Sequence, residues 1–84
     1  MFYFYIIQSF NDKNLYFGFT SDLKQRLAEH NSGKNWTTKM RRSFRLVYYE
    51  AYRAKEDAVR REHQIKLRAQ AFTGLKRRIT KSIL

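Results

Sequence analysis

The 84-residue chain carries 18 Lys and Arg residues against 7 Asp and Glu residues, which gives a formal net charge of +11. Cys and Pro are absent, so a disulfide framework, a thiolate metal site and a proline-rich linker are excluded. Because 43% of the residues are apolar and 17% are aromatic, the charge belongs to a folded domain and not to a disordered basic tail. We therefore expect a single domain over residues 1–84 that binds a polyanion, with nucleic acid as the first candidate and an anionic membrane surface as the second.

The sequence lacks the features of a membrane or secreted protein. It contains no apolar run of about 18 residues, which predicts that the chain does not span a bilayer. The first seven residues lack the basic start and the small-residue cleavage site of a signal peptide. These absences predict a cytoplasmic protein.

The first part of the chain predicts the strands, because aromatic and β-branched residues favour pleated sheet. Residues 2–9 form the first predicted strand, in which positions 2, 4 and 6 are all apolar. Turn-forming residues at 11–14 and an aromatic segment at 15–19 predict the returning strand of a hairpin. A third strand is predicted over residues 44–50.

The remaining segments predict helices. Possible N-caps at 20–22 and an Asn-Ser-Gly end at 31–33 predict a helix over residues 23–30. Residues 34–43 form a polar, basic connection without an acidic residue. The longest helix is predicted over residues 54–68 and a short basic one over residues 73–84, which gives the order β-β-α-β-α-α.

One acidic residue interrupts the apolar stripe of the long helix. An ionised carboxylate in an apolar face costs several kcal/mol unless a cation or strong hydrogen bonds compensate it. Glu62 is therefore half of a salt bridge, a side chain at a solvent-open edge, or a ligand for Mg²⁺ or Mn²⁺, which prefer carboxylate oxygen. At 100° per residue, the stripe comprises the residues that lie within about 40° of its centre line: Ala54, Ala58, Glu62, Ile65 and Ala69.

Further polar residues stand at unexpected positions in the first helix and the hairpin. Arg26 and His30 lie four residues apart beside the apolar face of the helix, as structural side chains or as catalytic ones. If the hairpin turn centres on residues 12 and 13, Tyr5 and Tyr16 lie on neighbouring strands and face the same side. Gly18 stands within the second strand, where glycine often marks a bulge or a close approach to a ligand.

Together these residues resemble the motifs of the GIY-YIG nuclease domain. The likeness is greatest to the small stand-alone, single-domain bacterial members and covers about residues 2–68, with residues 69–84 as a basic C-terminal helix. The sequence has Phe-Tyr-Ile in place of Gly-Ile-Tyr, and Gly74 where several nuclease members have an asparagine. The matching motifs, in order, are Phe4-Tyr5-Ile6, Tyr16-Phe17-Gly18, Arg26, His30 and Glu62.

The resemblance implies an α+β fold with a small three-stranded antiparallel sheet flanked by helices. It also implies Mg²⁺-dependent hydrolysis of phosphodiester bonds at a single metal, with Mn²⁺ as a substitute and no other small-molecule cofactor. Glu62 would bind the metal and Arg26 would stabilise the charge of the transition state. Tyr5, Tyr16 and His30 would orient the attacking water and take up its proton. A tyrosine is a poor base at neutral pH unless nearby cations lower its pKa, which Arg26, His30 and Mg²⁺ could do.

Basic residues outside the metal site are predicted to bind the phosphate backbone, which carries no base information. No recognition helix, finger or repeat that would read bases is evident. The sequence therefore predicts a monomeric DNA endonuclease of DNA repair or processing, with little sequence specificity or a preference for single-stranded or structured DNA, and no membrane partner. RNA as substrate and a non-catalytic nucleic-acid-binding module of the same fold are the alternatives. The predicted phosphate-binding residues are Lys34, Lys39, Arg41, Arg42, Lys66, Lys76, Arg77 and Arg78.

Overall fold

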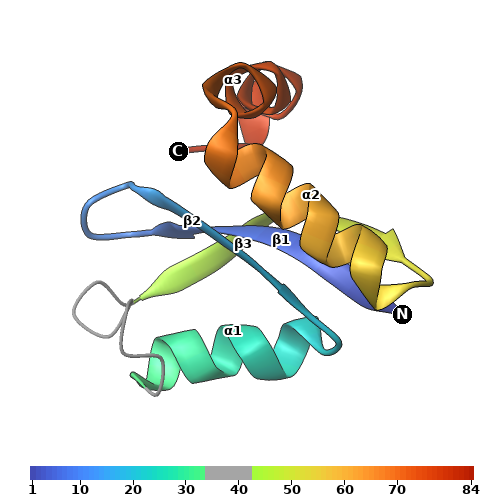
Figure 1. Cartoon of the computed structure of the whole chain (residues 1–84). Coiled ribbons are helices and arrows are strands. Elements are labelled where there is room, and N and C mark those ends of the chain that lie inside the picture. The colour runs from blue at the N-terminus through green and yellow to red at the C-terminus, as the bar shows by residue number, and fades with distance from the viewer. Residues whose placement is uncertain (34–42) are drawn as a thin grey trace.

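The predicted strands pair into one antiparallel sheet in the order β2-β1-β3, which puts β1 in the centre (Figure 1). The computed structural model describes residues 1–33 and 43–84. Within them the strands are β1 (Phe2–Ser9), β2 (Leu15–Thr20) and β3 (Phe44–Tyr52). The predicted α+β class and the order of the elements are confirmed.

Helices cover both faces of the sheet. The first, α1 (Leu23–Ser32), lies on one face, and α2 (Lys55–Leu67) and α3 (Ala69–Arg78) lie on the other (Figure 1). Of the two ranges expected for the last helix, 73–84 is wrong at both ends, whereas 69–84 has the correct start and extends too far. Arg68 adopts an extended backbone with φ −125°, so α2 ends and α3 begins directly after it. A short 3₁₀ helix, η2 (Thr80–Ser82), then follows α3.

The central strand separates two apolar clusters, because alternate side chains of a strand point to opposite faces. Phe4 and Ile6 are fully buried against α2 and α3, where they meet Ile65 and Leu75. On the other face Tyr5, Ile7 and Phe44 pack with the two leucines of α1. Both faces of a three-stranded sheet are thus used for packing, which suits a chain of this size.

Local signals fix the ends of α1 as predicted. The Asp22 Oδ1 atom accepts a hydrogen bond from the backbone N–H of Gln25 at 3.0 Å, which caps the first turn. Gly33 ends the helix with φ 82°, a conformation that glycine adopts without strain. These caps set the position of the helix that carries Arg26 and His30.

Two further sequence predictions concern phosphate binding and membrane spanning. The predicted phosphate-binding residues Lys34, Lys39, Arg41 and Arg42 lie outside the described residues. Among the helices of residues 1–33 and 43–84, none has the length and apolar character needed to cross a membrane.

Candidate active site

The pairing of β1 with β2 decides which side chains share a face. Tyr5 pairs with Gly18 and Ile7 pairs with Tyr16. Cross-strand partners point to the same face, as do residues two apart in one strand. Tyr5 and Tyr16 therefore share the face of the hairpin that packs toward α1, as predicted.

A pocket of about 510 Å³ lies at the open edge of β2, and we call it the edge pocket. Since β2 is an edge strand, α1 on one face and α2 on the other both contribute to its wall (Figure 1). A larger depression of about 650 Å³ follows the outer side of α2, but no predicted catalytic residue borders it. The residues around the edge pocket are Tyr5, Leu15, Tyr16, Phe17, Gly18, Phe19, Arg26, His30, Glu62 and Lys66.

The structure thus brings together all five predicted catalytic residues, and Gly18 with them. The role of this glycine is to make room for a phenol. A Cβ atom at Gly18 would lie 2.7 Å from the hydroxyl oxygen of Tyr5, closer than van der Waals contact allows. The predicted close approach at Gly18 is therefore an approach by a side chain of the same hairpin.

Tyr5 and His30 form a hydrogen-bonded pair, with 3.0 Å between the phenol oxygen and Nε2. Burial raises the pKa of Tyr5 to about 12, against a lowering by Arg26. Arg26 thus lowers the pKa of Tyr5 as expected, but burial has the larger effect. Burial, followed by Arg26, lowers the pKa of His30 below its ordinary value of 6.5. At neutral pH Tyr5 is therefore protonated and His30 is neutral. The phenol donates to Nε2 in the tautomer of His30 that carries its proton on Nδ1.

Tyr16 contributes its ring to the edge pocket, but its hydroxyl points elsewhere. The hydroxyl donates to the Asp12 carboxylate at 3.2 Å. The ring meets Phe44 edge-on, with 5.5 Å between the centroids. Sequence reasoning missed this bond to Asp12, although the turn between the two residues is a signal that could have indicated it.

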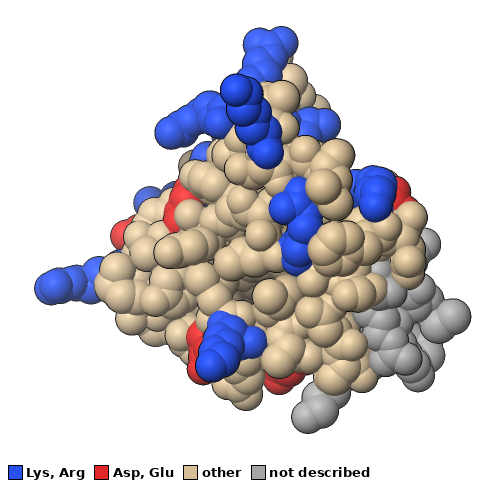
Figure 2. Space-filling view, turned by 180° about the vertical axis from the view of Figure 1, so that it is seen from behind, with Lys and Arg blue, Asp and Glu red and all other residues tan. Residues whose placement is uncertain are grey.

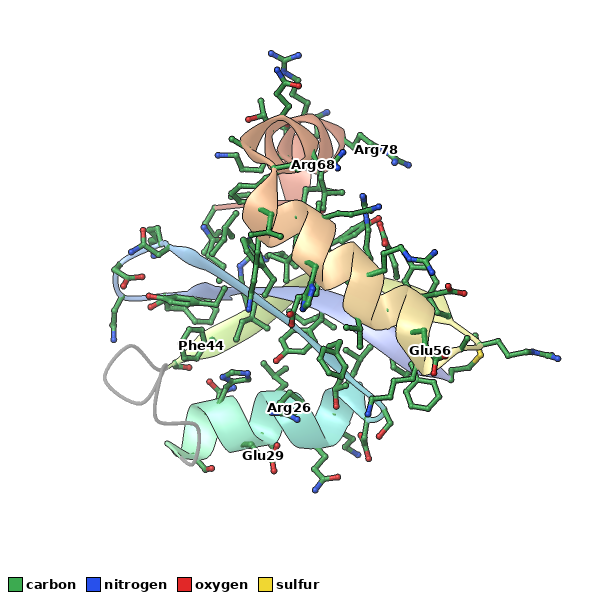
Figure 3. All side chains as sticks on the ribbon, viewed as in Figure 1. Arg26, Glu29, Phe44, Glu56, Arg68 and Arg78 are labelled. Atoms are coloured by element: carbon green, nitrogen blue, oxygen red, sulfur yellow. The ribbon has the colours of Figure 1, made fainter. Side chains whose placement is uncertain are left out.

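Arg26 presents a positive charge to the edge pocket. Its Nε atom is buried and makes no hydrogen bond to any described residue, although it lies 3.5 Å from a carboxylate oxygen of Glu29. Figure 3 labels both residues on α1. The side chain is 39% exposed, so the guanidinium is accessible to an anion that enters the pocket.

Glu62 is buried in α2 with only 8% of its surface exposed. Its carboxylate lies 3.6 Å from Nζ of Lys66, one turn further along the helix, and that lysine is half exposed. Of the alternatives for Glu62, an ion pair is thus present, as a long contact with a lysine. Lys66, predicted to bind the backbone outside the metal site, borders the same pocket.

The donor set around Glu62 suits a magnesium ion better than a metal held by a cage of protein ligands. Among the described residues, no group of three or more His, Cys, Asp or Glu side chains could hold a metal. Mg²⁺ is commonly bound by one or two carboxylates together with waters and substrate phosphates. A single carboxylate that faces a pocket fits this mode of binding.

The remaining residues predicted to contact the phosphate backbone do not border the edge pocket. Lys76, Arg77 and Arg78 form the last turn of α3 and are exposed. The Lys76 ammonium lies 4.8 Å from the centroid of the Phe72 ring. Figure 2 shows basic side chains at the end of the molecule where α3 lies.

Comparison with known proteins identifies the class. The model of the GIY-YIG catalytic domain matches residues 1–78. The chain therefore belongs to the GIY-YIG family, a nuclease family whose substrates are nucleic acids.

Its relatives are UPF0213 proteins, a small stand-alone branch of this family, as the sequence predicted. One from Staphylococcus epidermidis is 44% identical over 63 residues, which are 74% of this chain and 76% of the relative. Another from Staphylococcus haemolyticus is 45% identical over 65 residues, or 76% and 78% of the two chains. A third from Streptococcus pyogenes is 45% identical over 67 residues, or 79% and 72%. No solved structure matches the chain.

Proposed function

We propose that the protein is a Mg²⁺-dependent endonuclease that hydrolyses phosphodiester bonds in DNA with little sequence specificity, and that Mn²⁺ can replace Mg²⁺. One observation carries the proposal: a nearly buried carboxylate, a guanidinium and a Tyr–His pair border a single pocket. Hydrolysis of a phosphodiester requires neutralisation of phosphate charge and removal of a proton from water. Membership of a nuclease family supports the same assignment.

In this proposal Glu62 and Arg26 serve to neutralise the negative charge of the phosphate. A magnesium ion bound at Glu62 would polarise the scissile phosphate and stabilise the leaving oxygen. The Arg26 guanidinium would donate hydrogen bonds to the non-bridging oxygens, where negative charge accumulates in the transition state. Lys66 would neutralise part of the same charge once its ion pair with Glu62 is relaxed.

In this proposal Tyr5 and His30 remove the proton of the attacking water. The water oxygen forms a bond to phosphorus, and the bond to the leaving oxygen breaks with its electron pair. The Tyr5 hydroxyl accepts the water proton as it passes its own proton to Nε2 of His30, 3.0 Å away. The lowered pKa of His30 supports this path, because a neutral imidazole is present at neutral pH to accept the proton.

In this proposal Tyr16 orients the attacking water. Its ring borders the edge pocket, whereas its hydroxyl donates to Asp12. The assignment requires the hydroxyl to exchange this acceptor for the water when substrate binds.

The test compares two glutamates of α2 with opposite exposure. Glu62→Ala is expected to abolish Mg²⁺-stimulated cleavage and to leave DNA affinity intact or improved, since a negative charge near a phosphate is removed. Glu56→Ala, at an exposed position of the same helix (Figure 3), is the matched control and should cleave normally. Labelled single-stranded, duplex and branched DNA, and RNA, are incubated with each protein with and without Mg²⁺.

Two results would contradict the proposal. Cleavage at the wild-type rate by pure Glu62→Ala protein would rule out the metal role of Glu62. Binding without cleavage by the wild-type protein on every substrate would instead establish the non-catalytic module.

A further inference from the structure

A second polar cluster lies on the opposite side of α2 from the edge pocket. The Glu50 carboxylate on β3 accepts hydrogen bonds from the hydroxyls of Tyr48, at 2.6 Å, and Tyr52. It also accepts from Nε of Arg61 at 3.0 and 3.3 Å. Burial alone would raise the pKa of Glu50, but these bonds hold that pKa below its ordinary value. The cluster thus keeps an ionised carboxylate fixed by three side chains.

The position of Arg61 next to Glu62 connects the cluster to the edge pocket. Ala58 and Ile65, both buried, face the sheet from the underside of α2. Successive residues of a helix are about 100° apart, so Arg61 and Glu62 flank the sheet-facing side of α2, one on each side. Arg61 reaches the outer strand β3, and Glu62 reaches the pocket beside the other outer strand, β2.

The rotation of α2 about its own axis is set by the packing of Ile65 in the core together with the polar contact of Arg61 to β3. Ala58 is a small side chain, and the N-cap residue Ala54 makes no side-chain capping bond. A helix with side chains has a radius of about 5–6 Å, so a rotation of roughly 10° moves a side-chain tip by about 1 Å. Metal–ligand distances tolerate only about 0.2 Å. A small rotation would therefore take the carboxylate out of position.

We propose that the Glu50–Arg61 pair is a positioning device that fixes the rotation of α2 and thereby holds the Glu62 carboxylate where it can bind a divalent cation. The inference rests on the proposed function. It assigns Glu50 and Arg61 to the site although neither borders the edge pocket. Tyr48 and Tyr52 support the device by holding the Glu50 carboxylate on the strand.

The competing interpretation is that the pair only stabilises the fold. Both side chains are mostly buried, at 18% and 24% exposure, so their removal lowers the melting temperature under either interpretation. Cation binding separates the two, because a purely stabilising pair leaves the affinity of the folded protein unchanged.

The experiment titrates Mn²⁺ into the full chain without DNA and follows the paramagnetic broadening of amide NMR signals near Glu62. The test variants are Glu50→Gln, which keeps the shape of the side chain, and Arg61→Lys, which keeps the charge but not the planar group. Arg60→Gln is the matched control, because Arg60 forms an exposed pair with Asp57 at 3.7 Å on the same helix. All proteins are measured below their melting temperatures.

Both test variants are expected to bind Mn²⁺ about 10-fold more weakly than the wild type, at the lower end of the range for residues that support metal ligands. The control should bind as the wild type does. Wild-type affinity in folded Glu50→Gln and Arg61→Lys would overturn the positioning role and leave the proposed function intact. Absence of Mn²⁺ broadening in the wild type itself would overturn both. If Glu50→Gln does not fold, Arg61→Lys and Tyr48→Phe decide by the same criterion.

Discussion

The phenol of Tyr5 occupies the space that a side chain at position 18 would fill. Gly18 therefore contributes to the site because it has no side chain. The phenol lies across the glycine of the neighbouring strand and from there reaches Nε2 of His30. Any larger residue at position 18 would compete with the hydroxyl for this space. The position of the phenol therefore depends on the glycine as much as on its partner.

Gly18→Ala is expected to destabilise the protein by roughly 1–3 kcal/mol, the usual cost of overpacking a filled site. It should also reduce cleavage, because Tyr5 must move away from His30. Gly74→Ala is the control, since a Cβ atom there meets nothing within 4 Å and alanine is the better helix residue by roughly 0.5–1 kcal/mol. Urea unfolding and single-turnover cleavage measure both effects. A Gly18→Ala protein as stable and active as the wild type would contradict the packing argument.

His30 is expected to make the stability depend on pH. Its pKa in the folded state lies below the ordinary 6.5, with Tyr5, Arg26 and Glu29 as its titratable or charged neighbours. Well above pH 6.5 the imidazole is neutral in both states and adds no pH dependence. As the pH falls, the unfolded chain takes up the proton first, so the free energy of unfolding decreases until the folded-state pKa is passed.

The measurement is urea unfolding between about pH 5 and pH 7.5, where this difference in proton binding acts. The loss of stability toward acid pH should shrink in His30→Gln and persist in His63→Gln, a change at an exposed position. Cleavage should decline only as the pH approaches the lower folded-state pKa of His30, because the neutral imidazole of the folded protein accepts the proton. Identical pH profiles for wild type and His30→Gln would contradict the prediction.

At the scale of elements, patterns within one segment gave reliable predictions. Alternation in residues 2–9 and four-residue spacing in residues 23–30 predicted the faces of β1 and α1, because such periods follow from strand and helix geometry. The same reasoning put Glu62 on the buried face of α2. The Tyr16–Asp12 bond and the Glu50–Arg61 pair were not predicted, because they depend on turn conformation and on contacts between distant segments.

The last helix was the least well predicted element, although it completes the core. Leu75 is 2% exposed and packs with Phe4 and Ile6. It lies after the motifs recognised in the sequence, which end near residue 68, but within the family match, which extends to residue 78. Its short and strongly basic segment gave no clear period, so the end of α3 was not predicted. The contacts of Leu75 show that the region after residue 68 is part of the fold.

Leu75→Ala is therefore expected to destabilise the protein by about 2–5 kcal/mol, the range for removal of a buried leucine side chain. Leu67→Ala is the matched control, because Leu67 is 80% exposed and its change should stay within about 0.5 kcal/mol. Thermal and urea unfolding of both proteins decide the matter. A small effect of Leu75→Ala would show that α3 packs only loosely on the sheet.

At the scale of the whole molecule, the excess of positive charge remains after the ion pairs are formed. Within residues 1–33 and 43–84, ion-pair distances join basic side chains to four acidic residues, Glu29, Glu50, Asp57 and Glu62. Most basic side chains are exposed, and Figure 2 shows them spread over one face as well as at the end formed by α3. This distribution favours binding to a phosphate backbone by charge and not by base contacts.

Removal of the basic turn of α3 should therefore change the salt dependence of DNA binding. Each phosphate contact contributes about 0.9 to the slope of log affinity against log salt for duplex DNA and about 0.7 for single strands. Replacement of Lys76, Arg77 and Arg78 by Gln is expected to reduce the slope by roughly two to three if all three contact phosphates.

The control removes three exposed charges elsewhere: Lys24, Arg53 and Arg60. Fluorescence anisotropy in EDTA measures binding without cleavage. Because both variants lose the same net charge, equal slopes would show that α3 only adds to the general field, whereas a smaller slope in the α3 variant alone would place the strand on this helix.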